Sequence, residues 1–462
     1  MDHVLRQELE QICTKYDIRG IAGETLREEH ARAIGQGFAR WCTDTGRLDN
    51  GWIIIGRDCR ESGPALTEAF IEGASGAGAN VIDIGLASTD MLYAASGVHG
   101  APGVMITASH NPAHYNGMKL TGPWAEPLSK EHGIRDILDT ASRGTWRGGN
   151  KGRITKTDFL GRFVELVLAE IDTSSLAGTK VAVDAGNGMG GLMAPAVLEA
   201  AGIKFDILYG DLDGRFPNHP ANPLDYDNLR DLQQYISRDN YWAGIAFDGD
   251  ADRAFFIDAH GKPVPGSTTT SIVAQSMLRK NPGSTILYNL ICSRNVRETI
   301  EAAGGVAVRT PVGHSLIKRI MAETGAVFGG EHSAHYYFKT FWRADSGILA
   351  VLHTMQNLVE AGTSLHEVRA NYEPYIASGE INHKVDDVAG VLATIEAEWS
   401  RNVVDTLDGI SLDCGPWWGN IRGSNTEPLL RVNIEAENPE NLQKGIDSIS
   451  ATIKETQDRR KA

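Results

Sequence analysis

The sequence predicts an α/β protein with three similar mixed α/β domains followed by a smaller α+β C-terminal domain. The chain has 462 residues, and at about 150 residues per domain it is too long for a single core. It contains three similar strand, turn, helix and strand units, whose first strands begin at residues 53, 181 and 286. Near the C-terminus, polar and apolar residues alternate over 430–436, which is typical of a strand with one solvated face.

The three repeated units share one order of elements. A short apolar strand leads through a Gly- or Ser-bearing turn into an amphipathic helix, which is followed by a second apolar strand. Units of this length are typical of right-handed crossovers in largely parallel sheets. Their first strands lie more than 100 residues apart, which is the scale of a repeated domain. The expected helices are 65–78, 192–201 and 296–303, and the expected strands are 53–56, 81–84, 181–184, 205–208, 286–289 and 306–309.

The pattern changes after the third unit. Helical periodicity is present over 347–356, 364–372 and 441–455, and strands are expected at 409–412 and 430–436. A stretch over 143–153 is rich in Gly, Lys and Arg, which is typical of a linker. We expect domain boundaries that give the ranges 1–150, 151–255, 256–370 and 371–462.

Composition and charge exclude several classes of function. The net charge of −15 argues against general attraction to nucleic acid or an anionic membrane. Five scattered cysteines without a C-x-x-C pair favour a reduced protein over a disulfide framework or a zinc site. The charged N-terminus lacks the apolar core of a signal peptide, and no 18-residue apolar run occurs. We therefore expect a cytoplasmic protein.

An acidic segment lies between two apolar strands. Asp248, Asp250 and Asp252 alternate with small residues, and in an extended segment side chains at this spacing point the same way. Carboxylate ligands favour a hard ion such as Mg²⁺ or Ca²⁺ over zinc. An EF-hand is excluded because Arg253 and Ala259 occupy the positions of its turn Gly and its bidentate Glu. A solvated acidic turn is the alternative interpretation.

A second segment, Thr107-Ala-Ser-His-Asn-Pro, follows a predicted strand. Ser109 is a candidate nucleophile or phosphate carrier, with His110 and Lys119 nearby in the sequence. A capped turn explains the same residues, because Ser and Asn before Pro are common in turns. The chain has no G-x-S-x-G motif, which argues against an α/β-hydrolase.

Two further segments carry groups that bind sugars and phosphates. Arg422-Gly-Ser-Asn-Thr-Glu-Pro, with Arg431 beyond it, offers guanidinium groups, hydroxyls and a Gly-permitted turn for an oxyanion such as phosphate. The loop over 330–335 places Glu331, Ser333 and His335 at alternating positions, which suits sugar hydroxyls. A satisfied polar loop is the alternative interpretation of this second segment.

A glycine-rich turn resembles a dinucleotide-binding motif. Residues 186–191 match G-x-G-x-x-G after a strand, and Asp206 follows about twenty residues later. However, the turn lies in the middle one of three similar units, in the same expected domain as an acidic segment that hydride transfer does not need. We therefore favour a tight strand-to-helix turn. No P-loop motif is present.

The segments around Ser109, Asp248, Glu331 and Arg422, one in each expected domain, together resemble the α-D-phosphohexomutase family. The resemblance extends over essentially the whole chain, including Tyr16-Asp-Ile-Arg-Gly and Gly56-Arg-Asp-Cys-Arg. The motifs Ser-Asn-Thr-Glu-Pro and Gly-Glu-His-Ser-Ala-His are most similar to the phosphomannomutase/phosphoglucomutase branch. The resemblance implies an active site in the central cleft between the four domains.

The resemblance also implies a mechanism. Ser109 is expected to carry a phosphoryl group, with Mg²⁺ held beside it by Ser109, Asp248, Asp250 and Asp252. Phosphoserine then gives its phosphoryl group to a hexose monophosphate. The resulting hexose 1,6-bisphosphate, which also acts as an activator, turns over and returns the other phosphate to the serine. Glu331 and Ser333 are expected to hold the sugar hydroxyls. The expected ligands of the nonreacting phosphate are Arg422, Ser424, Asn425, Thr426 and Arg431.

Several residues match positions that the family places around the reacting phosphoryl group. These residues are Arg19, Lys119, Arg253, His314 and His335, and together with His110 beside Ser109 they are the candidate catalytic residues. His314, His335 and Lys119 are the candidates for the general base. Ile291 and Asp345 depart from the family pattern. These departures bear on the expected preference among substrates and not on the reaction class.

The predicted function is that of a phosphomannomutase, with a phosphoglucomutase or a dual-specificity enzyme as the alternative. Mannose and glucose differ only at C2, and a site need not distinguish the two orientations of one hydroxyl. A nicotinamide-dependent oxidoreductase and a non-catalytic sugar-phosphate-binding module are more remote alternatives. The expected partners are hexose phosphates, without nucleic acid or membrane, and the expected assembly is a monomer or a small homo-oligomer.

Overall fold

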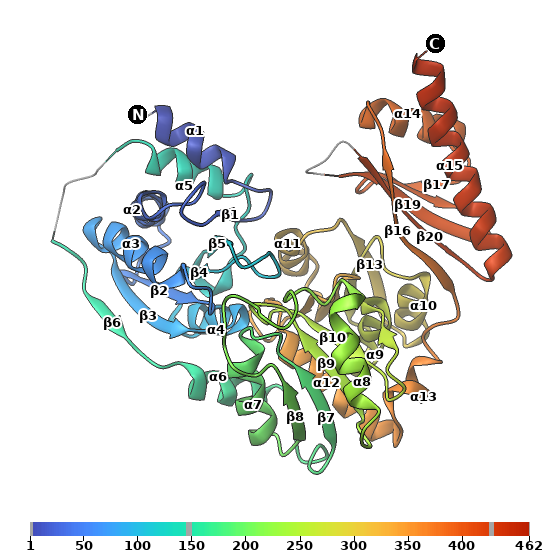
Figure 1. Cartoon of the computed structure of the whole chain (residues 1–462), viewed down its shortest axis with the longest axis horizontal. Helices are drawn as coiled ribbons and strands as arrows, with labels where there is room; N and C mark the ends of the chain where they lie inside the picture. The colour runs from blue at the N-terminus through green and yellow to red at the C-terminus, as the bar shows by residue number, and fades with distance from the viewer. Residues whose placement is uncertain (1–2, 145–149, 425–428, 462) are drawn as a thin grey trace.

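The computed structural model describes residues 3–144, 150–424 and 429–461 (Figure 1). The chain forms four units, called here domains I to IV, each built around one sheet. They follow one another in an arc, so that domain IV stands opposite domain I, with domains II and III between them (Figure 1). Three mixed α/β units followed by an antiparallel sheet with helices confirm the predicted fold class.

Domain I contains a six-stranded mixed sheet with the order β1-β5-β4-β2-β3-β6. The central strands β4, β2 and β3 are parallel, and α2 packs against α3 beside their buried Ile-rich face. The strands are β1 (Ile18–Ile21), β2 (Trp52–Arg57), β3 (Asn80–Leu86), β4 (Gly103–Ile106), β5 (Tyr115–Thr121) and β6 (Ile154–Lys156). The helices are α1 (His3–Gln11), α2 (Glu28–Asp44), α3 (Gly63–Gly76), α4 (Thr89–His99), η1 (Pro123–Ala125) and α5 (Ile134–Ala141).

Domain II contains a five-stranded sheet with the order β11-β10-β9-β7-β8. Strand β9 is parallel to β7 and antiparallel to β10, so the loop from β9 to β10 is a tight reversal. The strands are β7 (Lys180–Asp184), β8 (Lys204–Leu208), β9 (Ala243–Phe247), β10 (Ala254–Ile257) and β11 (Pro263–Val264). The helices are α6 (Leu160–Ala169), α7 (Gly190–Ala200), η2 (Tyr226–Leu229) and α8 (Arg230–Ile236).

Domain III contains a four-stranded sheet with the order β13-β12-β14-β15. Its buried helix α12 begins at an N-cap in which Ser346 accepts a hydrogen bond from the Leu349 amide, and ends at Gly362 in the left-handed region. The strands are β12 (Thr285–Asn289), β13 (Val306–Thr310), β14 (Phe328–Gly330) and β15 (Tyr336–Phe338). The helices are α9 (Gly266–Lys280), α10 (Arg294–Ala302), α11 (His314–Thr324), α12 (Gly347–Ala361) and α13 (Leu365–Arg369).

Domain IV contains an antiparallel sheet with the order β16-β20-β19-β18-β17. The alternating burial along β20 is the pattern expected of a strand with one solvated face. The strands are β16 (Ile376–Lys384), β17 (Val403–Asp405), β18 (Ile410–Asp413), β19 (Trp417–Gly423) and β20 (Leu429–Ala436). The helices are α14 (Val388–Glu398) and α15 (Pro439–Lys461).

Two strands fall across the domain boundaries expected from the sequence. Strand β6 follows the stretch expected to be a linker, and it pairs with β3 of the first sheet. The expected boundary between residues 255 and 256 falls inside β10, which belongs with β11 to the second sheet. Strand pairing joins residues that are distant in sequence, so composition alone does not locate these boundaries.

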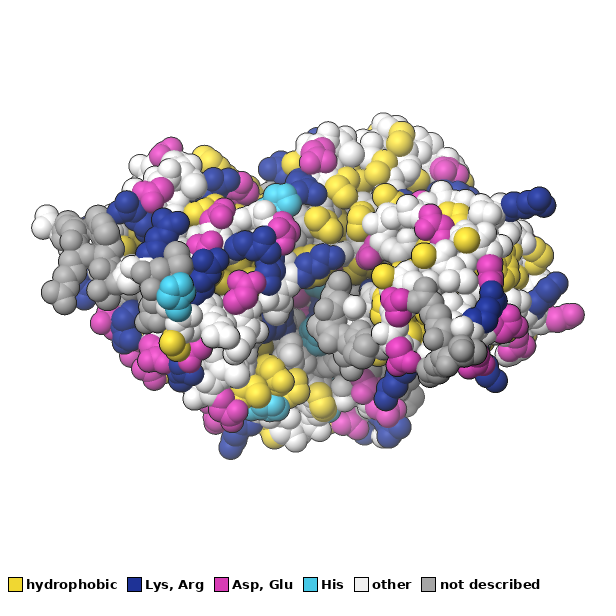
Figure 2. All heavy atoms as spheres, turned by 90° about the horizontal axis from the view of Figure 1, so that it is seen from above, with side chains coloured by type: hydrophobic (Ala, Val, Ile, Leu, Met, Phe, Trp, Pro, Cys, Tyr) yellow, Lys and Arg dark blue, Asp and Glu magenta, His cyan; other side chains and the backbone are white. Residues whose placement is uncertain are grey.

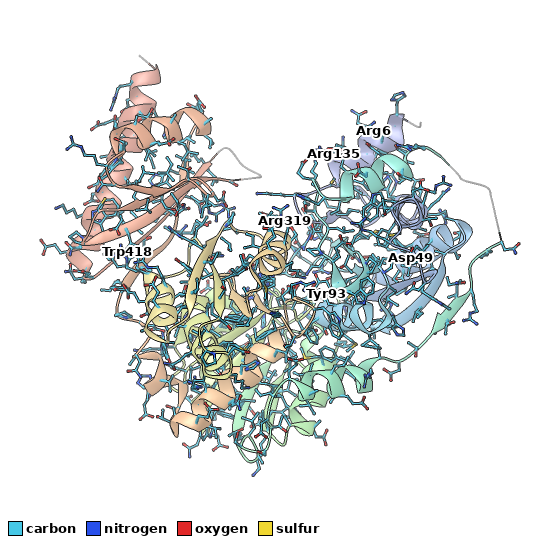
Figure 3. All side chains as sticks on the ribbon, turned by 180° about the vertical axis from the view of Figure 1, so that it is seen from behind. Arg6, Asp49, Tyr93, Arg135, Arg319 and Trp418 are labelled. Carbon is cyan, nitrogen blue, oxygen red and sulfur yellow. The ribbon has the colours of Figure 1, made fainter. Side chains whose placement is uncertain are left out.

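Domains III and IV meet through α10 and the sheet of domain IV. The Arg294 guanidinium lies 3.5 Å from the centre of the Trp418 ring and pairs with Asp413 at 2.7 Å. Figure 3 shows Trp418 on the side of domain IV that faces domain III. On the other side of domain III, Arg319 of α11 contacts His132 of domain I at 2.6 Å. Domain III therefore contacts domain IV on one side and domain I on the other.

Across the described ranges, no helix is long and apolar enough to cross a membrane. All five cysteines are free thiols, and Cys13 and Cys42 are buried. Cys59, Cys292 and Cys414 are partly buried, and none of the five is part of a disulfide framework.

Candidate active site

The loop after β4 holds Ser109 in an unusual backbone conformation. Its φ is +50°, in the left-handed region that residues other than Gly rarely adopt. The Thr107 hydroxyl accepts a hydrogen bond from the Ser109 amide at 2.9 Å and donates one to Asp58 at 2.6 Å. The hydrogen bond to Thr107 fixes the Ser109 backbone, and the residue is only 3% exposed.

Arg60 is the main support of this loop. Its side chain is fully buried and pairs with Asp58 at 3.1 Å. Its Nη2 donates to the carbonyls of Ser109 and Asn111 at 2.7 Å, and its Nη1 donates to Pro112 and Tyr115 at 2.7 and 3.0 Å. One guanidinium thus satisfies four carbonyls, a geometry that a lysine does not reproduce. In the sequence, Arg60 ends the segment Gly56-Arg-Asp-Cys-Arg, and nothing there indicated this role.

Arg60 gives a prediction about stability. In the variant Arg60→Leu the carboxylate of Asp58 is buried without its partner, a change that typically costs about 3–5 kcal/mol of unfolding free energy. Denaturant unfolding is expected to show that loss. Arg57→Leu is the matched control, because the partly exposed Arg57 makes only a 3.4 Å contact with a backbone carbonyl. Equal losses in the two variants would contradict the role of Arg60.

The acidic loop joins β9 to β10 and brings three buried carboxylates together. Asp248, Asp250 and Asp252 are at most 1% exposed, and one ligand atom from each lies within 4.8 Å of the others. The segment is a turn and not the extended stretch expected from the sequence, with Ala251 at φ +58°. The three carboxylates therefore come together because of the turn. The turn is tight because it joins the antiparallel strands β9 and β10.

These residues fit a hard cation. Asp250 Oδ1 and Asp252 Oδ1 are buried and have no hydrogen-bond partner among the described residues, which is costly for carboxylate oxygens unless a ligand takes them. All three donors are oxygen atoms, as Mg²⁺ prefers. Lys119 of β5 partly balances the charge, with Nζ 2.7 Å from Asp250 Oδ2 and in close contact with Asp252.

The electrostatics of the loop reflect this crowding. Burial, together with the charges of its acidic neighbours, raises the pKa of Asp252 well above its ordinary value. Burial also acts to raise the pKa of Asp250, but Lys119 and a 2.6 Å hydrogen bond from Thr89 outweigh it and lower that pKa. The two carboxylates keep the pKa of Lys119 raised despite its burial. Lys119 is therefore held as a cation.

The serine loop and the acidic loop are in direct contact. Ser109 Oγ donates to Asp248 Oδ2 at 2.8 Å, and Arg253 Nη2 lies 3.2 Å from the same hydroxyl. Gly249 permits this approach, since a Cβ there would lie 2.4 Å from the Ser109 carbonyl oxygen. His110 lies beside Arg253, with 2.5 Å between Nδ1 and Nη2. Burial and that guanidinium lower the pKa of His110 well below its ordinary value.

Arg19 of β1 closes the domain I side of the site. Its Nε donates to Asp17 at 2.9 Å, and its Nη1 donates to the Ala108 carbonyl and to Asn111 Oδ1 at 2.5 Å. The structure therefore brings together most of the residues predicted for catalysis and metal binding. This group contains Ser109, His110, Lys119, Arg19, Arg253, Asp248, Asp250 and Asp252.

The loop between β14 and β15 presents the predicted sugar-binding residues. Glu331 is buried and accepts hydrogen bonds from the Tyr337 hydroxyl at 2.6 Å and the Gly313 amide at 3.3 Å. Burial raises its pKa although these hydrogen bonds act to lower it. Ser333 Oγ lies 3.1 Å from His335 Nδ1, and His335 Nε2 lies 3.8 Å from Asp252. This loop therefore reaches the acidic loop of domain II.

In domain IV, Arg422 and Arg431 lie side by side on β19 and β20. Ser424 follows β19, and its amide donates to the Leu429 carbonyl at 2.9 Å. Two predicted phosphate ligands, Asn425 and Thr426, lie outside the described residues. His314 begins α11, but its side chain also lies outside the described part of the chain.

Tyr16 of domain I lies beside residues of domains III and IV. Its hydroxyl donates to the Val312 carbonyl of domain III at 2.8 Å. Burial, together with the charges of Asp408 of domain IV and Glu331 of domain III, raises the pKa of Tyr16 to about 12. The charge of Arg422 of domain IV acts to lower this pKa. Figure 2 shows this face hollowed at its middle, with Lys and Arg side chains gathered beside the hollow. The site therefore lies between domains, as the resemblance implied.

A buried ion pair that was not predicted from the sequence lies beside the site. Lys318 Nζ lies 2.6 Å from Asp345 Oδ1 and 3.6 Å from the centre of the Tyr93 ring. Tyr93 lies in the middle of the molecule, where domain I meets domain III (Figure 3). Ligand atoms of Asp345, Asp252 and His335 lie within 4.8 Å of one another. Asp345 was noticed in the sequence only as a departure from the family pattern, and nothing there indicated its partner.

The glycine-rich turn of domain II packs against protein backbone. A Cβ at Gly188 would lie 2.7 Å from the Gly249 carbonyl oxygen, and one at Gly191 would lie 2.0 Å from that of Gly210. Asp206 pairs with Lys180 at 2.8 Å and accepts a hydrogen bond from Tyr241 at 2.5 Å. These contacts favour the tight-turn interpretation. The turn packs against the acidic loop, and Asp206 already has protein partners.

All four domains match descriptions from one group of proteins. Residues 10–146, 159–261 and 265–375 match "Phosphoglucomutase/phosphomannomutase, alpha/beta/alpha" domains I, II and III. Residues 380–451 match the corresponding C-terminal domain. These matches cover most of the chain in the order in which the four sheets occur.

Relatives with similar names align along nearly the whole length. A protein of Xanthomonas campestris named "Phosphohexose mutases" is 40% identical over 429 residues, which are 91% of this chain and 94% of that protein. A Pseudomonas putida protein named "Phosphomannomutase/phosphoglucomutase" is 35% identical over 96% of each chain. Among solved structures, a Burkholderia thailandensis phosphoglucomutase/phosphomannomutase family protein aligns with a TM-score of 0.88 at 27% identity, covering 97% of this chain and 98% of that one.

Proposed function

This chain belongs to the phosphoglucomutase/phosphomannomutase family, and on that premise we propose that it interconverts mannose 6-phosphate and mannose 1-phosphate. It is a phosphohexomutase, an enzyme of the isomerase class, as its relatives are. The observation that carries the finer proposal is the 2.8 Å contact between Ser109 Oγ and Asp248. This contact supports the proposal, because a hydroxyl able to carry phosphate would lie directly beside the carboxylates that would hold Mg²⁺.

In the proposed reaction, phosphoserine 109 is the donor. The bond between its phosphorus and Oγ breaks as a hydroxyl oxygen of the hexose monophosphate bonds to that phosphorus. The product is a hexose 1,6-bisphosphate, which also serves as the activator that primes the enzyme. After this intermediate reorients, its other phosphoryl group returns to Ser109. Bound Mg²⁺ supplies charge neutralisation at the phosphoryl group, the main requirement of such a transfer.

Residues of all four domains take part in this proposal. Arg253 and Arg19 orient the phosphoryl-carrying loop through the contacts described above. Glu331 and Ser333 bind the ring hydroxyls, and the nonreacting phosphate is held by Arg422, Ser424, Asn425, Thr426 and Arg431. Closure of the domains around the intermediate excludes water, which protects the phosphoserine from hydrolysis.

The proton of the attacking hydroxyl needs an acceptor. Lys119 is a poor base, because Asp250 and Asp252 hold it in its charged form. His110 remains neutral, but its Nδ1 already faces Arg253. We assign the general base to His335, whose ring lies between Ser333 and Asp252. His314 remains a second candidate for the same role.

The function is tested by phosphorus NMR of mannose 1-phosphate incubated with the protein, Mg²⁺ and a trace of glucose 1,6-bisphosphate. We expect conversion to the 6-phosphate. Glucose 1-phosphate, run in parallel, is expected to react as well, because a relative in Pseudomonas putida is named for both sugars. If neither sugar changes while a known mutase works in the same tube, the proposed substrates are wrong.

A further inference from the structure

Domain IV contains a cluster of three charged residues on neighbouring strands, called here the arginine clamp. Arg422 on β19 and Arg431 on β20 are directly opposite each other in the register of these strands, a position in which like charges repel. Glu380 belongs to β16, on the other side of β20. Its Oε2 lies 3.0 Å from Arg422 Nη2, and its Oε1 lies 3.5 Å from Arg431 Nη1. One carboxylate therefore bridges both guanidinium groups.

The clamp has unused donors. The Nε atoms of Arg422 and Arg431 are buried, and neither has a hydrogen-bond partner among the described residues. The Arg422 side chain is 8% exposed, whereas that of Glu380 is 34% exposed. The Arg431 side chain is 31% exposed, so Glu380 and Arg431 are the accessible members of the cluster. One oxygen of Glu380 faces each arginine, while a phosphate monoester has three terminal oxygens with which to contact the same pair.

The clamp faces the rest of the site. The charge of Arg422 acts on Tyr16 of domain I, where it lowers a pKa that burial raises. The charge of Glu380 acts on His332 of the sugar-binding loop, where it raises a pKa that burial lowers more strongly. The Nδ1 atom of His332 is itself held 3.1 Å from the Ser267 hydroxyl. Glu380 therefore lies on the side of domain IV that meets the proposed substrate.

We propose that Glu380 is a positioning residue that acts as an internal counter-anion of the phosphate clamp. It holds the two guanidinium groups together when no phosphate is bound, and it competes with the phosphate for them. This inference rests on the proposed function, in which the bisphosphate must leave the clamp, turn over and bind again with its other phosphate. Phosphate leaves the clamp more readily when Glu380 is present, because the guanidinium groups of Arg422 and Arg431 then pair with its carboxylate and are not left unpaired.

The test is the variant Glu380→Gln, which keeps the size of the side chain and removes its charge. Inorganic phosphate binding is measured by calorimetry in EDTA, so that the acidic loop binds no metal. The variant is expected to bind phosphate roughly fivefold more tightly, the scale of a partly exposed ion pair. In turnover assays with mannose 1-phosphate, both KM and kcat are expected to fall, because the substrate is held more tightly and the intermediate reorients more slowly.

Two further variants separate the clamp from general electrostatics. Glu437→Gln changes the net charge of domain IV equally at an exposed position and is expected to leave phosphate affinity unchanged. Glu380→Asp keeps the charge on a shorter side chain that cannot bridge both arginines, so an intermediate affinity is expected. It also tests the inference if Glu380→Gln does not fold. Phosphate affinity that is unchanged or weaker when the bridge is removed overturns the role of Glu380.

The same data distinguish this inference from the proposed function. If the unmodified enzyme has no turnover but Glu380→Gln binds phosphate more tightly, the proposed substrates are wrong and the counter-anion role of Glu380 is supported. If turnover is normal but phosphate affinity is unchanged in Glu380→Gln, the proposed function is supported and the role of Glu380 is wrong. Arg422→Gln is the positive control for the location of the site, and it is expected to lose phosphate binding in EDTA.

Discussion

The variant Ser109→Ala is expected to lose mutase turnover by a factor of about 10⁴ or more, the scale of removing a covalent nucleophile. No other hydroxyl among the described residues combines a 2.8 Å contact to Asp248 with a position beside Arg253. The alanine variant is expected to keep the conformation of the loop, because Arg60 binds the Ser109 backbone carbonyl and not its side chain. Turnover is measured with mannose 1-phosphate, and labelled glucose 1,6-bisphosphate reports transfer of phosphate to the protein.

A matched control is Ser62→Ala in the same domain. The Ser62 hydroxyl accepts a hydrogen bond from Asn116 at 2.9 Å. Among the described residues it is not hydrogen-bonded to the acidic loop, so turnover and labelling are expected to persist. Retained turnover in Ser109→Ala would contradict the phosphoserine mechanism. If Ser109→Ala still binds the sugar phosphate but has lost turnover, the protein is not a non-catalytic binding module, because such a module would not need Ser109.

The variant Asp252→Asn is expected to lower turnover by about 10³-fold, because charge neutralisation by a metal contributes several kcal/mol to such transfers. It replaces a buried carboxylate oxygen that has no hydrogen-bond partner among the described residues with an amide of the same size. The reduced negative charge weakens cation binding. Mg²⁺ is therefore expected to raise the Tm of the unmodified protein, measured after EDTA treatment, and to have little effect on the Tm of the variant.

A second acidic cluster supplies the control for this prediction. Glu8, Glu29 and His30 also bring ligand atoms within 4.8 Å of one another, but Arg27 pairs with both carboxylates at 3.0 and 2.6 Å. Glu29→Gln is expected to leave the Mg²⁺-induced change in Tm and the turnover intact. The assignment of the metal to the aspartate loop fails if EDTA does not affect turnover, or if Glu29→Gln abolishes the effect of Mg²⁺.

Local patterns were enough to predict the fold class. Each strand and helix in the three repeated units was located to within a few residues, because its alternation or helical periodicity lies within a short stretch of chain. The same holds for β20, whose burial alternates as the sequence pattern predicted. The family resemblance added the order of the four site loops and their expected roles, and the domain matches confirm the family.

Pairing between distant residues was not predictable in the same way. Arg60 lies about fifty residues before the loop that it supports, and Glu380 lies on a different strand from each arginine that it bridges. The contact of Lys119 with the acidic loop joins residues 131 and 133 positions apart. Sequence spacing carries no information about such contacts, because they depend on how the domains pack.

The sequence by itself determined the secondary structure, the repeated domains and the chemical groups available at each loop, since these follow from local propensity and composition. The tertiary structure decided which of these groups meet. It turned three aspartates into a tight cluster in which two buried oxygens have no hydrogen-bond partner among the described residues. It also packed the glycine-rich turn against protein backbone, which disfavours an open dinucleotide site. The physical reason is that burial and long-range contact set the electrostatic role of a side chain, and both exist only after the four domains have packed.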